Sequence, residues 1–250
     1  MKKLFILILS IFFSTTCLMA ENYAKIYASS NLEYVFIDMI KAFYQQYPND
    51  SVHIEYGSSG YLYKQILNGN DYDIFLSADM SYPQKLYKKG LALLPANPYI
   101  RGFLVLVAPK NSISSVYDLQ KNFSLSIIIP NTKYAPYGKA TIAFLKKIGI
   151  YNKIKSKVKY VNDVGLVVDK VLWSHNIGFI PTSFLAMFDK KKITHILADK
   201  TLYPPIIQGY AISKKGNLNH SAMDFLKFLS SKKGIGIFEK YGYSKYKKQR

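Results

Sequence analysis

The sequence predicts an α/β protein made of two lobes, and three observations lead to this prediction. Short apolar runs of strand length alternate along the chain with amphipathic stretches of helical period, which is typical of a mostly parallel sheet covered by helices on both faces. No internal repeat or low-complexity linker interrupts this alternation. Helices that would share one site come from both early and middle parts of the chain, which favours two sheets over one.

The strand and helix segments follow one another in a regular order. Nine segments have the composition and length of strands: Lys25–Ala28, Val52–Tyr56, Asp73–Ser77, Phe103–Ala108, Leu125–Ile129, Lys159–Val161, Ile177–Ile180, Ile193–Leu197 and Ile206–Ile212. The amphipathic segments expected to form helices cover residues 32–43 and 59–68, the stretches after Pro136 and after Asp163, and residues 221–229 and 232–240.

The first 20 residues are typical of a secretory signal peptide. Lys2 and Lys3 precede an apolar run over residues 4–13, and the segment ends near Ala20. The run is too short to span a bilayer comfortably, so we expect cleavage after Ala20 and a periplasmic mature protein. Cys17 lacks the upstream aliphatic residue expected before a lipidated cysteine, which makes a lipoprotein the less favoured alternative.

Composition limits the chemistry of the mature chain. Cys17 is the only cysteine, so the mature protein has no disulfide and no cysteine metal site. The four histidines are isolated and lack metal-ligand spacing, and no cofactor motif is present, so we expect neither a free metal cation nor a cofactor. The net charge of +19 comes from lysines spread along the chain, which indicates a solvated surface. Export argues against nucleic acid, but the basic tail 245–250 leaves polyanion binding as an alternative.

Four predicted strands end in small, hydroxyl or amide residues and run directly into a predicted helix. These turns cover residues 29–31, 57–60, 130–136 and 162–164. Ligands of open α/β sheets bind at the carboxyl ends of strands, where helix starts offer unpaired N–H groups and a positive dipole end. Any one turn alone is explained by helix capping. The four turns together predict a site for a small oxyanion held by uncharged donors.

Such a site suits a fully deprotonated dianion. An oxyanion stripped of water needs nearly all of its oxygens hydrogen-bonded, and a site without acceptors offers nothing to the O–H of hydrogen phosphate. A secreted serine hydrolase that uses Ser58 or Ser59 remains an alternative, although residues 57–60 do not form the G-x-S-x-G nucleophile motif.

Six stretches in this order resemble the periplasmic molybdate-binding proteins of ABC importers. They are residues 27–32, 57–60, 73–79, 104–110, 203–205 and 238–243, and the run from Asp73 to Asp79 is the most specific. The resemblance covers essentially the whole mature chain. It implies a binding protein, not an enzyme, that carries molybdate or tungstate to a membrane permease, and we take a monomer as the default state. A protein for another oxyanion, such as sulfate, is the alternative.

The resemblance also implies a type II periplasmic binding protein fold, with two lobes joined by two crossing strands. Lobe 1 would comprise residues 21–103 and 204–250, and lobe 2 residues 104–203. The hinge strands would lie near Phe103–Ala108 and Ile206–Ile212.

The family binds its anion through two serines, two backbone amides and a tyrosine hydroxyl. The second serine matches Ser59, and the two amides match Ala135 and Val164. Asn31 stands at the first serine position and can donate through its side-chain amide and its N–H. Pro181, at the tyrosine position, has neither a hydroxyl nor an N–H. It is a weaker candidate, together with neighbours and possible substitutes for the tyrosine: Ser30, Ser58, Thr182 and Tyr137.

Overall fold

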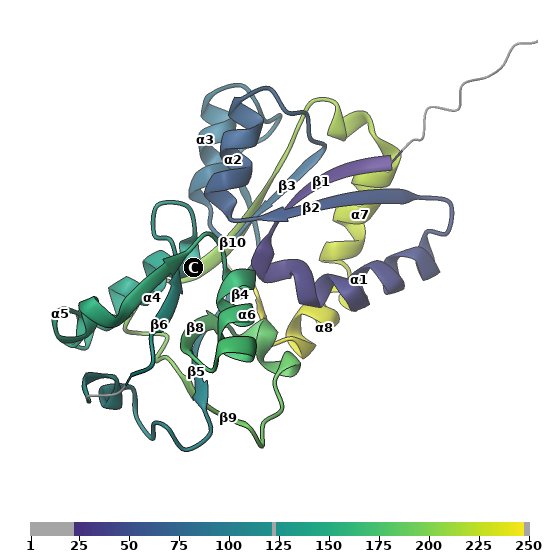
Figure 1. The fold of residues 1–250 in the computed structure, drawn as a ribbon. Coiled ribbons are helices and arrows are strands. Elements are labelled where there is room, and N and C mark those ends of the chain that lie inside the picture. The colour runs from purple at the N-terminus through teal and green to yellow at the C-terminus, as the bar shows by residue number, and fades with distance from the viewer. Residues whose placement is uncertain (1–22, 122–123, 248–250) are drawn as a thin grey trace, which may run out of the picture.

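The computed structural model describes residues 23–121 and 124–247, which form two lobes, each built on its own sheet (Figure 1). Lobe 1 carries a six-stranded sheet in the order β11-β4-β10-β3-β1-β2, and lobe 2 carries a five-stranded sheet in the order β7-β6-β8-β5-β9. The predicted two-lobed α/β architecture is confirmed. The expected signal peptide lies outside the described residues, and none of the helices described is long and apolar enough to cross a membrane.

Each lobe contains strands and helices in alternation. Lobe 1 consists of β1 (Tyr23–Ser29), η1 (Ser30–Leu32), α1 (Glu33–Gln46), β2 (Ser51–Gly57), α2 (Ser59–Leu67), β3 (Ile74–Ser77), α3 (Ser81–Lys88), β4 (Asn97–Gly102), β10 (Ile206–Ile212), η5 (Gly216–Leu218), α7 (His220–Ser230), α8 (Lys232–Lys240) and β11 (Ser244–Lys245). Lobe 2 consists of β5 (Leu104–Pro109), η2 (Val116–Gln120), β6 (Ile127–Pro130), α4 (Pro136–Lys147), α5 (Tyr151–Ile154), η3 (Lys155–Lys157), β7 (Val158–Val161), α6 (Val164–Ser174), β8 (Ile177–Pro181), η4 (Thr182–Met187) and β9 (Ile193–Leu197).

Both sheets are mixed, so the expectation of a mostly parallel arrangement is wrong. Parallel pairing is confined to β1–β2, β1–β3, β6–β7 and β6–β8. Every antiparallel pair includes β4, β5 or β10, the strands that flank the two passages between the lobes. The chain enters lobe 2 at Phe103 and returns through residues 198–205. Parallel neighbours need a crossover connection, usually a helix, within the same sheet. A strand that enters the sheet from the other lobe has no such connection, so it can run antiparallel to its neighbour.

The sheet of lobe 1 is covered on both faces. Ile26 and Ala28 of β1 and Ile74 and Leu76 of β3 pack in one buried cluster with the apolar faces of α1, α7 and α8. Their neighbour Tyr27, on the opposite side of the pleat, packs in a second cluster with α2 and α3. This period-2 division of side chains fixes the register of the strands. The carboxyl ends of β1 and β2 therefore hold their following helices in defined positions.

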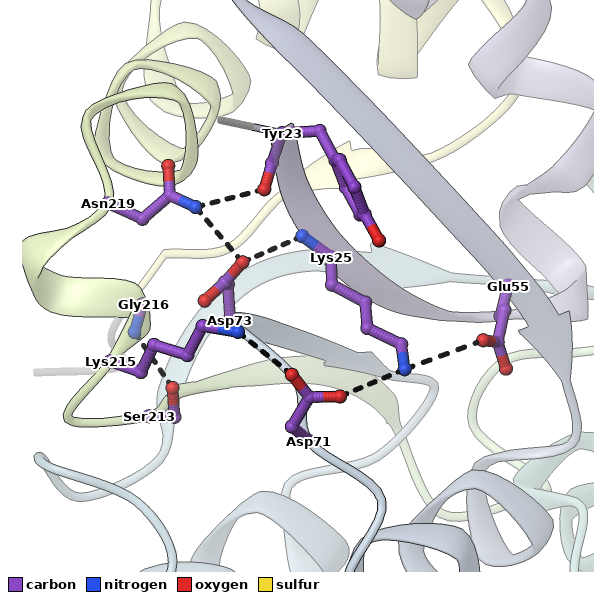
Figure 2. Close-up of polar contacts among 9 residues, drawn as sticks. All are labelled: Tyr23, Lys25, Glu55, Asp71, Asp73, Ser213, Lys215, Gly216 and Asn219. Carbon is purple, nitrogen blue, oxygen red and sulfur yellow. Dashed lines mark hydrogen bonds and ion pairs between the residues drawn. The ribbon is translucent and has the colours of Figure 1, made fainter. Parts of the chain in front are cut away.

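A polar cluster ties together the other end of the lobe 1 sheet, away from these carboxyl ends (Figure 2). The buried Asp73 carboxylate accepts the Lys25 N–H at 2.7 Å and an N–H of the Asn219 side chain at 3.1 Å. At the surface, Asp71 accepts from the Nζ atoms of Lys25 at 3.0 Å and Lys215 at 2.8 Å. These bonds join the chain after β10 to β1 and β3, and their role is structural.

Candidate functional site

Within each lobe, two helix starts lie side by side because two parallel strands end together. In lobe 1, Ser29 and Gly57 are partners at the ends of β1 and β2, which brings the start of η1 next to the start of α2. In lobe 2, Pro130 and Val161 are partners at the ends of β6 and β7, which brings α4 next to α6. The register therefore produces two pairs of helix starts, as the sequence predicts.

The two pairs meet across the lobes. The Gly60 N–H of lobe 1 donates to the Tyr134 carbonyl of lobe 2 at 2.8 Å. The Ser183 hydroxyl of lobe 2 donates to the Asn31 carbonyl of lobe 1 at 3.0 Å, and η1 also contacts α6. The lobes are thus closed on each other. The four main predicted site residues are all buried: Asn31, Ser59, Ala135 and Val164.

Three serine hydroxyls lie at the lobe 1 helix starts. The Ser59 hydroxyl accepts the Ala78 N–H at 2.9 Å and donates to the Ser29 Oγ at 3.2 Å, so its position is fixed. Ser30 and Ser58 are nine-tenths buried, and their hydroxyls have no hydrogen-bond partner in the part of the chain that the structure describes. Ser58 stands at the N-cap of α2 without making a cap bond. Because a hydroxyl proton can rotate, all three can donate to a guest.

The Asn31 side chain is already used by the protein. Its amide nitrogen donates to Gln208 Oε1 at 3.0 Å and to the Tyr243 hydroxyl at 2.9 Å, which occupies both protons. The Tyr243 hydroxyl in turn donates to the Asn31 carbonyl at 2.6 Å. In this arrangement the Asn31 side chain has no proton left for an anion, contrary to the expectation, so its backbone N–H is the remaining candidate donor. The Asn31 Oδ1 is buried and has no partner among the described residues.

At the start of α4, the free N–H belongs to a different residue from the one expected. Ala135 lies at the site, but its N–H donates to the Asn131 carbonyl at 2.9 Å. Pro136 has no N–H, so the first unpaired N–H of α4 by position is that of Tyr137.

The start of α6 carries a carboxylate that caps the helix. Asp163 accepts the Leu166 N–H at 3.1 Å through its Oδ1. Val164 is the first residue of α6, so its N–H has no acceptor within the helix. Its side chain is buried in the lobe 2 core, which fixes the direction of that N–H.

The position of the family's tyrosine offers no donor here. Pro181 is buried at the end of β8, and the Thr182 hydroxyl donates to the Gly242 carbonyl at 3.1 Å. The Tyr137 hydroxyl accepts from Gln208 Nε2 at 3.4 Å.

The sequence did not predict the residues that anchor Asn31, which are Gln208, Tyr243 and Ser183. The one available signal was Gln208, a buried amide within the apolar run of β10.

A groove of about 540 Å³ runs between the lobes beside the starts of α2 and α6. Gly57, Ser58 and Lys64 line it from lobe 1, and Tyr134 and Asp163 line it from lobe 2. Lys64 is the only cationic lining residue, and its Nζ donates to the Tyr134 hydroxyl at 3.0 Å. The groove thus presents one cation and one carboxylate, and the helix starts add unpaired N–H groups with their positive dipole ends.

Comparison with known proteins agrees with the resemblance found in the sequence. Residues 24–244 match the family described as bacterial extracellular solute-binding protein. The chain is 29% identical over 209 residues to a molybdate-binding protein of Rhodobacter capsulatus, covering 82% of this chain and 81% of the relative. It is 30% identical over 220 residues to a molybdate-binding protein of Azotobacter vinelandii, covering 83% and 86%. The solved structure of the Azotobacter vinelandii periplasmic molybdate-binding protein superposes with a TM-score of 0.82 at 28% identity, covering 90% of this chain and all of that one.

Proposed function

Because the chain belongs to the bacterial extracellular solute-binding proteins, we propose that it captures molybdate between its lobes and delivers it to the membrane permease of an ABC importer. The molybdate-binding relatives support this choice of anion. The observation that carries the proposal is the meeting of four helix starts at one closed cleft, with unpaired and uncharged donors in both lobes. The protein would be exported and would act in the periplasm as a monomer without catalytic activity.

Six donors are proposed to replace the hydration shell of the anion. They are the hydroxyls of Ser30, Ser58 and Ser59 and the N–H groups of Asn31, Tyr137 and Val164. Each hydrogen bond to a charged group contributes about 1.5–3 kcal/mol net. After the costs of association and lobe closure, six such bonds correspond to micromolar to nanomolar binding. Tungstate has the same charge and shape, so the same donors serve it.

Calorimetry of the purified mature protein tests this function. Molybdate and tungstate should bind with micromolar to nanomolar affinity, whereas sulfate and phosphate should bind much more weakly. Crystals grown with molybdate should give an anomalous-scattering peak between the starts of α2 and α6. Tight binding of sulfate alone would overturn the choice of anion.

The two alternative functions, serine hydrolysis and polyanion binding, can be tested on the same purified protein. The four histidines are exposed, and no described contact joins any of them to Ser58 or Ser59, so a serine hydrolase would lack its base. Ester hydrolysis that disappears in Ser59→Ala would contradict the binding function.

Deleting residues 245–250 tests the polyanion-binding alternative. The deletion should leave the affinity for molybdate unchanged, whereas a protein that binds polyanions through this tail would lose its binding.

A further inference from the structure

We propose that Gly60 and Tyr134 form a latch that holds the lobes closed, so that Gly60 sets the affinity for the anion without contacting it. The latch is defined as Gly60, Lys64 and Tyr82 of lobe 1 with the segment Lys133–Tyr134 of lobe 2. The inference rests on the proposed function only for the identity of the anion, because the latch itself is a contact between the lobes.

The backbone of Gly60 is committed to lobe 2. Gly60 is the second residue of α2, where an N–H has no acceptor within the helix and would ordinarily be available to a ligand. This N–H instead donates to the Tyr134 carbonyl at 2.8 Å. The Gly60 N–H therefore contributes to the contact between the lobes and is not available to the anion.

Only glycine allows the lobes to approach this closely. A Cβ atom on residue 60 would lie 2.8 Å from the Tyr134 Cα and 2.5 Å from the Tyr82 hydroxyl oxygen. The tyrosine hydroxyl can swing away, but the Tyr134 Cα is backbone and moves only if its segment moves. Any side chain at position 60 therefore pushes lobe 2 away from α2.

Side chains from α2 and α3 hold the same segment from both sides. The Tyr82 hydroxyl donates to the Lys133 carbonyl at 3.1 Å. The Lys64 Nζ donates to the Tyr134 hydroxyl at 3.0 Å and lies 4.5 Å from the centre of its ring. The held segment leads directly into α4, whose first free N–H is that of Tyr137. Docking of the segment therefore positions an anion donor.

These contacts join residues of different lobes, so they contribute to the closed form and not to the open one. The apparent affinity of a ligand falls in proportion to the fraction of protein in the binding-competent state. Weakening the latch should thus weaken binding even though every proposed anion donor is still present.

The test is Gly60→Ala, with Gly236→Ala as its matched control. Gly236 also lies within a helix, α8, but a Cβ there would meet no atom within 4 Å. We expect Gly60→Ala to weaken molybdate binding at least tenfold, mainly through faster dissociation. The Tm of the ligand-free protein should change little, because the higher helix propensity of alanine offsets the shift that its Cβ imposes on Tyr82 of the same lobe. Gly236→Ala should bind as the wild type does.

A distance measurement separates the latch from the choice of anion. The mature chain is expected to contain no cysteine, so spin labels at Lys88→Cys in α3 and Lys147→Cys in α4 report the separation of the lobes. Gly60→Ala should shift the distance distribution to longer values, and Tyr134→Phe, which keeps the ring, should shift it less. If the wild type binds no oxyanion, the proposed function fails while the distances still test the latch. If Gly60→Ala shows wild-type distances and affinity, the latch is wrong.

Discussion

The two lobes contribute to the cleft in different ways. Of the proposed donors, lobe 1 supplies three side-chain hydroxyls, those of Ser30, Ser58 and Ser59, and one backbone N–H, that of Asn31. Lobe 2 brings the backbone N–H groups of Tyr137 and Val164, whose side chains are buried in the lobe 2 core. A side-chain donor is lost by replacing one residue with alanine. A backbone donor survives every such replacement except proline. The comparison therefore predicts that alanine scanning detects the three hydroxyl donors of lobe 1 and misses the backbone donors, which include both donors of lobe 2.

The strongest test of this difference is Val164→Pro. Proline suits the first position of a helix, and Asp163 before it is extended, with φ −150° and ψ 178°. The substitution removes one N–H and leaves the helix intact. Loss of one hydrogen bond to a charged group should weaken molybdate binding by about 10- to 150-fold, measured by calorimetry.

The control for Val164→Pro is His220→Pro, at the first position of α7, far from the cleft. It should change neither the affinity nor, by much, the Tm. Val164→Ala should also bind far better than Val164→Pro. Equal affinities of Val164→Pro and the wild type would remove the N–H of Val164 from the site.

Within lobe 1, comparing Ser59→Ala with Ser58→Ala separates binding from stability. Both variants should lose about tenfold in affinity, because each lacks one donor to the anion. Only Ser59→Ala should also lose about 1–3 kcal/mol of unfolding free energy, since the buried Ala78 N–H then has no acceptor. Denaturant unfolding of the ligand-free proteins measures this. Equal destabilisation by both changes would contradict the assigned contacts.

A smaller effect concerns carboxylates that the two lobes bring together. Burial, with the charges of Asp163 and Asp169 in lobe 2, raises the pKa of Glu33 in lobe 1. An ionised Glu33 therefore opposes closure, and this penalty disappears as the pH falls through its raised pKa. Glu33→Gln should tighten molybdate binding by about two- to fivefold at pH 7.

The pH dependence of this gain is the check. The ratio of the affinities of Glu33→Gln and the wild type, measured at each pH, cancels the protonation of the anion itself. This ratio should approach one as the pH is lowered. A ratio that grows on acidification would mean that Glu33 does not oppose closure.

The smallest expected effect lies outside the cleft, in the cluster of Figure 2. Hydrogen bonds from Lys215 and Lys25 lower the pKa of Asp71 to about 2. Asp71 therefore stabilises the fold above its unfolded pKa of about 4, and this contribution is lost as the pH falls towards 2. At neutral pH, Asp71→Asn should lower the Tm by about 2 °C or less, because the pair is exposed. The difference should shrink in acid; a constant difference would contradict the assignment.

The pattern of the sequence predicted the two-lobed α/β architecture, but not the direction of every strand and only part of the site. The nine predicted strands are all present, because alternation and apolar runs reflect burial directly. The strand β4 escaped prediction because Pro98 and Gly102 interrupt its pattern. The four turns were predicted correctly as helix starts. At the start of α4, the Ala135 N–H is not free because it donates to the Asn131 carbonyl. No local sequence pattern indicates such a bond.

The anchoring residues escaped prediction for a related reason. Asn31, Ser183, Gln208 and Tyr243 are far apart in the chain, and their contacts follow from the way the lobes pack. Local periodicity describes single elements, so it carries no information about polar groups that meet through tertiary packing.

The place of β10 has a consequence for biosynthesis. This strand lies inside the lobe 1 sheet, between β3 and β4, yet it is made only after every strand of lobe 2. During the proposed export, the strands of lobe 2 are all present once residue 197 has emerged, whereas β10 is complete only at residue 212. Until then β3 has an open edge and β4 has no partner in its sheet. A chain that stalls in this interval exposes these unpaired strands, which makes it a target for aggregation and proteolysis.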